Sequence, residues 1–234
     1  MSGRARPPFG WRHAPAPYPE RLSDQVGRAM TRMMLRFWIG AEHVGREHIP
    51  RRGPAILVAN HPTLGDPFTV AFGTRRWVTW LAMEEALDWP LAGWIMRLYR
   101  VIPLDLERAG VRSIRTAYAT LARGRLLGVF CEGERSQGLG LNDPIKSGAA
   151  RMALRAGVPL VPVSVAGARR GWPLGSYPRR GKVVVRYHPP LDPRSFRPDL
   201  PRRERGALLT QALAEAIASG LPPAGRPRFQ RPWR

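Results

Sequence analysis

The chain has 234 residues, enough for one domain with a substantial core, and its 44% hydrophobic content is ordinary for a globular protein. Its 38 Lys and Arg residues against 17 Asp and Glu give a net charge of +21, which favours a polyanionic partner, either nucleic acid or an anionic membrane surface. The single cysteine, Cys131, excludes a disulfide framework and a thiolate metal cluster.

Both ends of the chain are predicted to be disordered tails, residues 1–19 and 221–234, because they are rich in Pro and Arg. Between them lies one predicted domain, residues 20–220. Its predicted elements, in chain order, are helix 20–38, strand 55–59, helix 67–73, strand 77–83, helix 84–98, strand 101–105, helix 110–123, strand 126–131, helix 147–156, strand 159–166, strand 182–187 and helix 203–219. This alternation of helices with apolar strands predicts an α/β fold, with a mostly parallel central sheet flanked by helices.

The first predicted helix, 20–38, is amphipathic. Apolar residues recur at helical spacing, and Arg28, Arg32 and Arg36 form a stripe on another face. Such a helix suits a bilayer interface, although a helix packed on the core with its arginines in water has the same pattern. The chain contains no run of about 18 apolar residues and no signal-peptide pattern. We therefore expect a cytoplasmic protein that is either soluble or bound to a membrane surface.

The stretch "AILVANHPTLGDPF", residues 55–68, places a histidine at the end of a predicted strand and a carboxylate five residues later. In mostly parallel sheets, ligands gather at the carboxyl ends of the strands. Pro62 suits the first position of a helix, which places His61 near a helix start. If the four residues between His61 and Asp66 fold back, the Asp66 carboxylate reaches the imidazole and fixes its tautomer. His61 can then take a proton from an alcohol that attacks a carbonyl carbon. The alternative is that His61 caps a helix and Asp66 starts a turn.

A second polar cluster, "FCEGERSQG", follows predicted strand 126–131. Gly133 allows the backbone to approach a ligand closely, and Arg135 can grip a phosphate through two parallel hydrogen bonds. Glu132 can hold that guanidinium or a ligand hydroxyl. The alternative is an ion pair on a surface loop.

Taken in order, these stretches resemble the glycerolipid acyltransferase family, whose best-known members are the lysophosphatidic acid acyltransferases. The family's Asn-His-x₄-Asp motif matches Asn60, His61 and Asp66, and its Phe-Pro-Glu-Gly-Thr-Arg-Ser motif matches Phe130, Glu132, Gly133, Arg135 and Ser136. The segments "EALDWPLAGWIMRLYRVIPLD" and "IKSGAARMALRAGVPLVPVSV" are similar to the second and fourth motifs, so the resemblance covers about residues 45 to 190.

The resemblance implies transfer of an acyl chain from acyl-coenzyme A or acyl-carrier protein to the hydroxyl of a lysophospholipid, first of all 1-acyl-glycerol-3-phosphate. It implies His61 as the general base oriented by Asp66. It also implies that Glu132, Gly133, Arg135 and Ser136 bind the acceptor, with no metal and no bound cofactor. For such an enzyme we expect a peripheral location on the cytoplasmic side of the cell membrane, with an anionic membrane surface as a partner.

Three departures from the family pattern concern the acceptor. Met83 stands where the second motif usually begins with lysine, and Leu106 stands where that motif usually ends with arginine, with Arg108 as the nearest substitute. Glu134 replaces the threonine of the third motif. A less charged hydroxylated lipid therefore remains an alternative acceptor, and a non-catalytic protein that binds lipid or nucleic acid remains an alternative function. No nucleic-acid-reading motif is recognisable.

Overall fold

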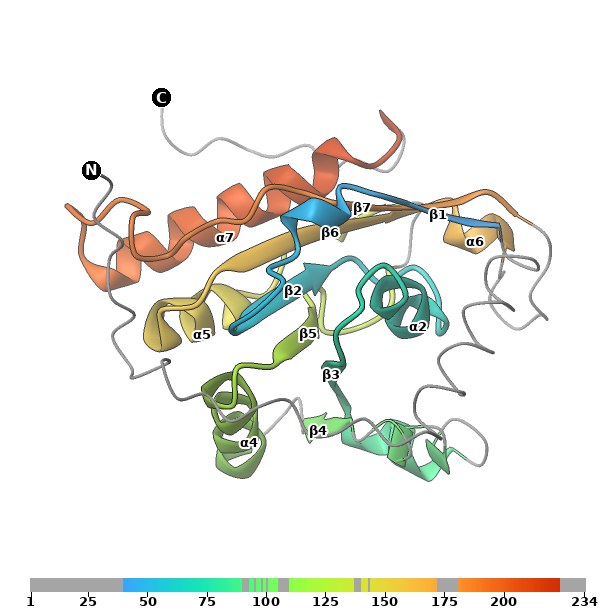
Figure 1. Cartoon of the computed structure of the whole chain (residues 1–234), viewed down its shortest axis with the longest axis horizontal. Helices are drawn as coiled ribbons and strands as arrows, with labels where there is room; N and C mark the ends of the chain where they lie inside the picture. The colour runs from blue at the N-terminus through green and yellow to red at the C-terminus, as the bar shows by residue number, and fades with distance from the viewer. Residues whose placement is uncertain are drawn as a thin grey trace.

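A seven-stranded sheet lies at the centre of the protein in the computed structural model (Figure 1). The structure describes residues 40–89, 93–94, 96–97, 99, 101–104, 110–136, 140–142, 144–171 and 181–223. The predicted amphipathic helix 20–38 and the predicted tail 1–19 lie outside the described residues, as does Arg108.

The elements follow one another in an order close to the predicted one. The strands are β1 (Ala41–Val44), β2 (Ala55–Ala59), β3 (Val78–Met83), β4 (Ile102–Leu104), β5 (Leu126–Phe130), β6 (Leu160–Ala166) and β7 (Val183–Tyr187). The α-helices are α2 (Asp66–Ala71), α4 (Val111–Ala122), α5 (Gly148–Ala156), α6 (Ala168–Gly171) and α7 (Arg202–Ser219), and two 3₁₀ helices are η3 (Arg46–His48) and η4 (Glu84–Asp88).

The strand order is β1-β7-β6-β2-β5-β3-β4, and every neighbouring pair is parallel except β6 and β7. This confirms the predicted α/β class with a mostly parallel central sheet. β2 lies in the middle, between β5 and β6, and Ala59 at its end is in register with Phe130 at the end of β5. The loops that follow these two strands therefore begin side by side.

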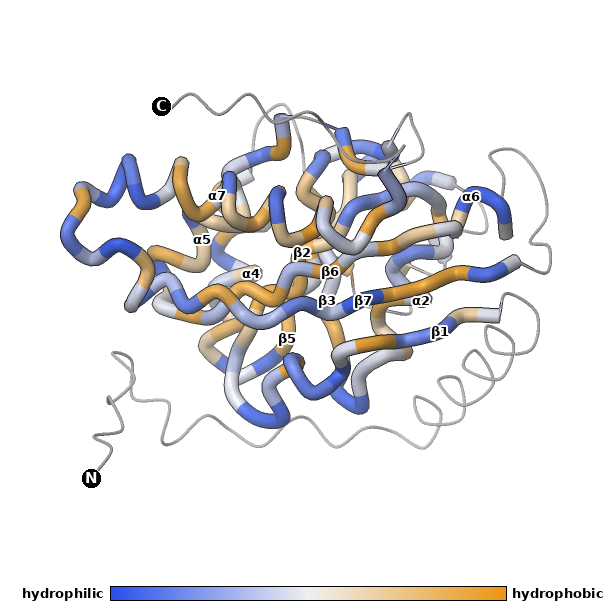
Figure 2. The backbone as a smooth tube through the Cα atoms, turned by 90° about the horizontal axis from the view of Figure 1, so that it is seen from above, coloured by the Kyte–Doolittle hydropathy of each residue, from blue (hydrophilic) through white to orange (hydrophobic). Residues whose placement is uncertain are grey.

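The two faces of the sheet are covered differently. Residues Ile56 and Val58 of β2 face the core under α4, α5 and α7, whereas Leu57 and Ala59 face the core on the side of α2. Figure 1 shows α4, α5 and α7 on one side of the sheet and α2 on the other. Because both faces are buried, β2 is apolar throughout instead of alternating, as expected for a parallel strand. Figure 2 shows hydrophobic residues along the strands and hydrophilic residues in the surrounding loops.

Several predicted boundaries were wrong. β1 was not predicted, because its sequence AEHV is polar, as befits a strand at the edge of the sheet. The helix predicted over 84–98 begins as the short 3₁₀ helix η4, which is followed by an extended Trp89, whose position before a proline in the sequence disfavours helical geometry. Residues 93–94 and 96–97 are helical, as predicted. Leu221, assigned to the C-terminal tail, is buried in the core cluster under α7.

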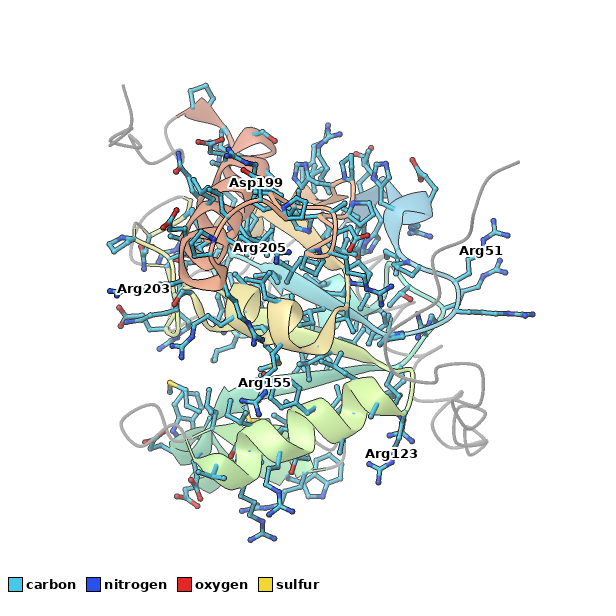
Figure 3. All side chains as sticks on the ribbon, turned by 90° about the vertical axis from the view of Figure 1, so that its left-hand side faces the viewer. Arg51, Arg123, Arg155, Asp199, Arg203 and Arg205 are labelled. Carbon is cyan, nitrogen blue, oxygen red and sulfur yellow. The ribbon has the colours of Figure 1, made fainter. Side chains whose placement is uncertain are left out.

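The excess positive charge is spread over the outside of the molecule. Figure 3 shows Arg123 and Arg203 on the side that carries α4, α5 and α7, and Arg51 projecting from the loop before β2. Arg155 lies between α5 and α4, with its guanidinium 5.5 Å from the centre of the Tyr118 ring. Arg151 and Arg155 of α5, with Arg202 of α7, lie close enough to Tyr118 to act on its charge, although burial outweighs them and raises the Tyr118 pKa. Among the described residues, no helix is both long and apolar enough to cross a membrane.

Candidate active site

His61 and Glu132 lie where the parallel strands β2 and β5 end. Asn60 fixes this end of β2 against β6: its amide accepts a hydrogen bond from the N–H of Val165 (2.8 Å) and donates one to the Val165 carbonyl (3.0 Å). This side chain is fully buried, so its polar atoms require such partners. Asn60 therefore has a structural role in holding His61 in place.

The imidazole of His61 is held by Asp66, as the spacing predicted. Nδ1 of His61 lies 3.0 Å from Oδ2 of Asp66. Asp66 is itself fully buried, and Thr63 donates to it twice, through the main-chain N–H (2.6 Å) and the hydroxyl (2.7 Å). A carboxylate that accepts from Nδ1–H fixes the tautomer with Nε2 as the free acceptor. In the described part of the chain, Nε2 has no hydrogen-bond partner, and His61 lines the cavity described below.

The helix predicted over 67–73 is confirmed as α2, but the expectation that Pro62 opens a helix was wrong. Helix α2 begins at Asp66, after a turn over residues 62–65, with Pro67 in its first turn. Asp66 is placed by the first turn of α2 and by Thr63, whereas His61 lies in the loop before this helix. The turn brings the two side chains together.

Glu132 connects the two loops. Its carboxylate accepts hydrogen bonds from the main-chain N–H of His61 (2.8 Å), from the hydroxyl of Ser136 (2.7 Å) and from the main-chain N–H of Asn142 (2.9 Å). The main-chain N–H of Ser136 in turn donates to the His61 carbonyl at 2.9 Å. Burial raises the pKa of Glu132, and these donors partly oppose the rise. Both main-chain polar groups of His61 are thus bonded to the predicted phosphate-binding loop.

The other predicted site residues lie around this connection. Arg135 is exposed, lines the cavity and has no hydrogen bond or ion pair within the described residues. Gly133 also lines the cavity, with a φ of 76° that favours glycine. Ser136 is buried and makes its bonds within the protein, and the Arg169 guanidinium of α6 donates to its carbonyl. The observed contacts of Glu132 are with main-chain groups and Ser136, not with Arg135.

Three rings are stacked behind the histidine. The rings of His61 and Phe130 are 3.8 Å apart and 13° from parallel, and those of Phe130 and Trp80 are 4.7 Å apart and 11° from parallel. Trp80 of β3 lies over Gly128, its register partner on β5, where a Cβ atom would come within 2.4 Å of the indole. Gly128 therefore provides the space in which the stack forms.

An apolar cavity of about 640 Å³ opens beside His61. Its walls come from α2, β3, η4, the ends of β4 and β5, and the loop at 133–135. The lining is largely hydrophobic and aromatic, including Phe68, Phe72, Trp80 and Tyr99. The volume falls in the range of small-molecule sites. Because residues from Val78 to Met83 all line it except Thr79, the cavity runs along β3, which spans about 17 Å at the usual rise per residue.

Arg76 lies at the far end of this cavity, and its guanidinium is hydrogen-bonded to main-chain carbonyls. Its guanidinium donates to the carbonyls of Pro50 (2.7 Å), Gly53 (2.6 Å) and Gly124 (2.6 Å), which precede β2 and β5. Burial lowers its pKa. This arginine joins the amino ends of two strands, so its role is structural.

Cys131 is buried beside Glu132, and its thiol donates to the Ala59 carbonyl at 3.3 Å. Burial raises the pKa of this thiol well above its ordinary value, and the neighbouring Glu132 adds to the effect. A thiol of this kind is a poor nucleophile. In the part of the chain that the structure describes, no three His, Cys, Asp or Glu residues are grouped as a metal site would require.

Sequence reasoning missed the residues that hold the site from behind. Trp80 and Asn142 carry no recognisable motif, because their roles depend on neighbours that are remote in the chain or on main-chain hydrogen bonds. Only Thr63, between His61 and Asp66, offered a signal, since a hydroxyl three residues before an acidic residue is a common local hydrogen-bonding pattern.

Comparison with known proteins agrees with these motifs. The family described as "Acyltransferase" matches residues 40–166. A 1-acyl-sn-glycerol-3-phosphate acyltransferase of Bacillus subtilis is 27% identical over 179 residues, 76% of this chain and 86% of the relative. One from Limnanthes alba is 30% identical over 184 residues, 76% of this chain and 64% of the relative.

Among solved structures, the 1-acyl-sn-glycerophosphate (LPA) acyltransferase PlsC from Thermotoga maritima superimposes with a TM-score of 0.66 and 26% sequence identity, over 89% of this chain and 82% of that one. The family match covers more than half of the chain and contains both the His61 and the Glu132 loops. The chain therefore belongs to the acyltransferase family and is an O-acyltransferase.

Proposed function

We propose that the protein acylates the free hydroxyl of 1-acyl-sn-glycerol-3-phosphate with an acyl thioester, as a step of phospholipid biosynthesis. The names of its relatives and of the T. maritima structure support this acceptor. The observation that carries the proposal is the arrangement of His61, whose Nδ1 is bonded to the buried Asp66 while Nε2 is free beside an apolar cavity.

In the proposed reaction, Nε2 of His61 takes the proton of the acceptor hydroxyl as its oxygen attacks the thioester carbonyl. The new C–O bond forms, the C–S bond breaks, and the imidazolium returns its proton to the leaving thiolate. The products are the ester and the free thiol, and the neutral imidazole is restored. General base catalysis of this kind contributes about 10²–10⁴ in rate. The thioester is already activated, so the step requires no metal and no bound cofactor.

The cavity is the proposed site of an acyl chain. Its lining offers an alkyl chain an apolar environment, and burying each methylene is worth about 0.8 kcal/mol. His61 lies at the polar end, where the carbonyl carbon must react. The donor is acyl-coenzyme A or acyl-carrier protein.

Arg135 is the proposed contact for the acceptor phosphate. It lines the cavity beside His61 and is uncommitted within the described residues, so it is free to bind an anion. Glu132 acts on the acceptor only indirectly in this proposal, because its oxygens are occupied by protein donors. Arg108 is proposed as an additional cation.

The acceptor is proposed to enter from an anionic membrane on the cytoplasmic side of the cell membrane. Leu64 and Trp89 line the cavity and are 40% and 36% exposed, and Trp94 is 62% exposed. Exposed tryptophans suit a membrane interface, and the net charge of +21 favours anionic lipid. Helix 20–38 is proposed as a second contact.

Substitution of the His61–Asp66 pair tests the proposal. Purified wild type, His61→Ala and Asp66→Asn are assayed with lysophosphatidic acid and either acyl-coenzyme A or acyl-carrier protein, and circular dichroism checks the fold. We expect His61→Ala to abolish turnover and Asp66→Asn to lower kcat by about 10²–10⁴, because an amide no longer fixes the imidazole tautomer. Turnover by His61→Ala at the wild-type rate would show that the base is another group.

A further inference from the structure

The ring stacked on His61 has no part in the reaction as written above. Phe130 is the last residue of β5, and its ring lies 3.8 Å from the imidazole, nearly parallel to it. Its other face is covered by Trp80. The imidazole is therefore held in two ways, by Asp66 in the plane of its ring and by Phe130 against its face.

We propose that Phe130 is a positioning residue that keeps the imidazole of His61 in its reactive orientation and stabilises the imidazolium that forms when the acceptor hydroxyl loses its proton. This inference rests on the proposed function of His61 as general base.

The physical reason is the negative face of an aromatic ring. A cation over that face is attracted to it, and the attraction is stronger where water is excluded. The neutral imidazole gains only stacking from Phe130, whereas the imidazolium gains both stacking and this electrostatic attraction. The contact is thus stronger in the transition state than in the ground state, which is the condition for an effect on kcat.

Trp80 and Gly128 are what make the contact rigid. Phe130 is fixed between two rings, and the indole is accommodated only because residue 128 has no side chain. The stack therefore depends on the register of β3 and β5, in which Trp80 is paired with Gly128.

Other charged groups also act on His61 and have to be held constant. Asp66 bonds to its ring from α2, Glu132 bonds to its main chain from the loop after β5, and Glu134 and Arg135 line the same cavity. Substitutions of Phe130 change none of these charges, so their effect isolates the ring.

The test compares Phe130→Leu and Phe130→Tyr with Phe68→Leu. Phe68 lines the same cavity, but its ring packs edge-on against Tyr99 and is not the ring stacked on the imidazole, so its substitution makes the same chemical change without removing the stack. We expect Phe130→Leu to lower kcat about threefold to thirtyfold. We expect Phe130→Tyr, which keeps an aromatic ring, to retain most of the wild-type kcat. We expect Phe68→Leu to change mainly KM, because it alters the surroundings of the acyl chain.

A second measurement does not depend on turnover. In protein with isotope-labelled histidine, the NMR signals of His61 are identified by their absence from His61→Ala. The His61 ring signals should move in Phe130→Leu, because the ring current of the stacked phenyl group is lost, and they should keep their wild-type positions in Phe68→Leu. If Phe130→Leu fails a circular dichroism check, Phe130→Met serves in its place, since it also lacks the ring.

The outcomes distinguish this inference from the proposed function. If wild type turns over, His61→Ala does not, and Phe130→Leu has the same kcat as Phe68→Leu, the positioning role is overturned and the general base stands. If wild type has no turnover but the His61 ring signals move only in Phe130→Leu, the ring contact is supported and the proposed reaction fails.

Discussion

Glu132 accepts a hydrogen bond from the main-chain N–H of His61 at 2.8 Å, although the two residues are 71 positions apart in the chain. The Ser136 hydroxyl donates to the same carboxylate oxygen, and the Ser136 N–H donates to the His61 carbonyl. The histidine is therefore held by the loop that also presents Arg135, so a disturbance of this loop affects the base and the proposed phosphate contact together.

Glu132→Gln should impair catalysis without unfolding the protein. The three groups that Glu132 contacts are all donors, and a glutamine amide offers one acceptor oxygen where the carboxylate has two. We expect kcat to fall about tenfold to a hundredfold, the equivalent of one lost charge-assisted bond. The exposed neighbour Glu134→Gln is the control and should leave the melting temperature unchanged. A Glu132→Gln enzyme with wild-type kcat would show that the bonds to His61 do not matter for activity.

Arg135→Ala should separate phosphorylated from neutral acceptors. Lysophosphatidic acid, lysophosphatidylglycerol and monoacylglycerol are compared as acceptors at one donor concentration. We expect lysophosphatidic acid to be the best acceptor and its kcat/KM to fall about tenfold to a hundredfold in the variant, because one charge-assisted contact is lost. Arg123→Ala is the control, because Arg123 is an exposed arginine at the end of α4 that does not line the cavity (Figure 3). If monoacylglycerol is preferred and Arg135→Ala has no effect, Arg135 does not bind phosphate and the enzyme acts on an uncharged lipid.

Gly128→Ala should destabilise the protein by about 1–3 kcal/mol, because the new methyl group overlaps the indole of Trp80. Combining it with Trp80→Leu should recover part of this loss, and urea unfolding of the four proteins of the cycle measures the coupling. Gly148→Ala is a matched control, since a Cβ there meets nothing within 4 Å. Equal effects of the two glycine substitutions would mean that the contact with Trp80 is not the cause.

The fold should lose stability between about pH 6.5 and pH 4 through His188. Burial lowers the pKa of this histidine to about 4, with Arg186 and His48 contributing. Its Nε2 lies 2.6 Å from the hydroxyl of Ser164, which itself donates to the Ile217 carbonyl of α7. Because the unfolded chain binds the proton at a higher pH than the folded one, stability is complete above pH 6.5 and declines as the pH falls towards 4.

The loss through His188 is up to about 3 kcal/mol at pH 4. Urea unfolding of wild type and His188→Gln over this pH range measures it, with the variant expected to show the smaller decline. Parallel pH profiles for the two proteins would assign the acid sensitivity to other groups.

Cys131→Ala should retain most of the activity. The thiol is buried with a raised pKa, and a thiol-specific reagent should label it slowly in the folded protein. A loss of turnover as deep as that of His61→Ala would instead indicate an acyl-cysteine intermediate.

The strands that carry the site were predictable, but their neighbours were not. The apolar runs at 55–59 and 126–131 predicted β2 and β5, and His61 and Glu132 followed directly from where these runs end. The order of the strands is not contained in either run. The bonds between Glu132 and His61, and the stack of Trp80 on Phe130, depend on pairings between remote strands, which local patterns do not specify.

Short and polar elements escaped prediction for a different reason. β1 has only four residues, AEHV, at an edge of the sheet, and no apolar run marks it in the sequence. α6 has four residues, too few for a helical period to show. The cavity was also not predictable, because its walls come from segments between His61 and Arg135 that meet only in the folded chain.

The bonds between Asn60 and Val165 join positions that are 105 residues apart, which has a consequence for synthesis on the ribosome. At about 5–20 residues per second, roughly 5 to 20 seconds separate the addition of these two residues. During this interval β2, the apolar centre of the future sheet, has been synthesised but its neighbour β6 has not. For much of the interval its other neighbour, β5, is missing as well. A nascent chain that stops short of Val165 therefore exposes an unpaired apolar strand, and shielding by a chaperone during this interval would suppress its aggregation.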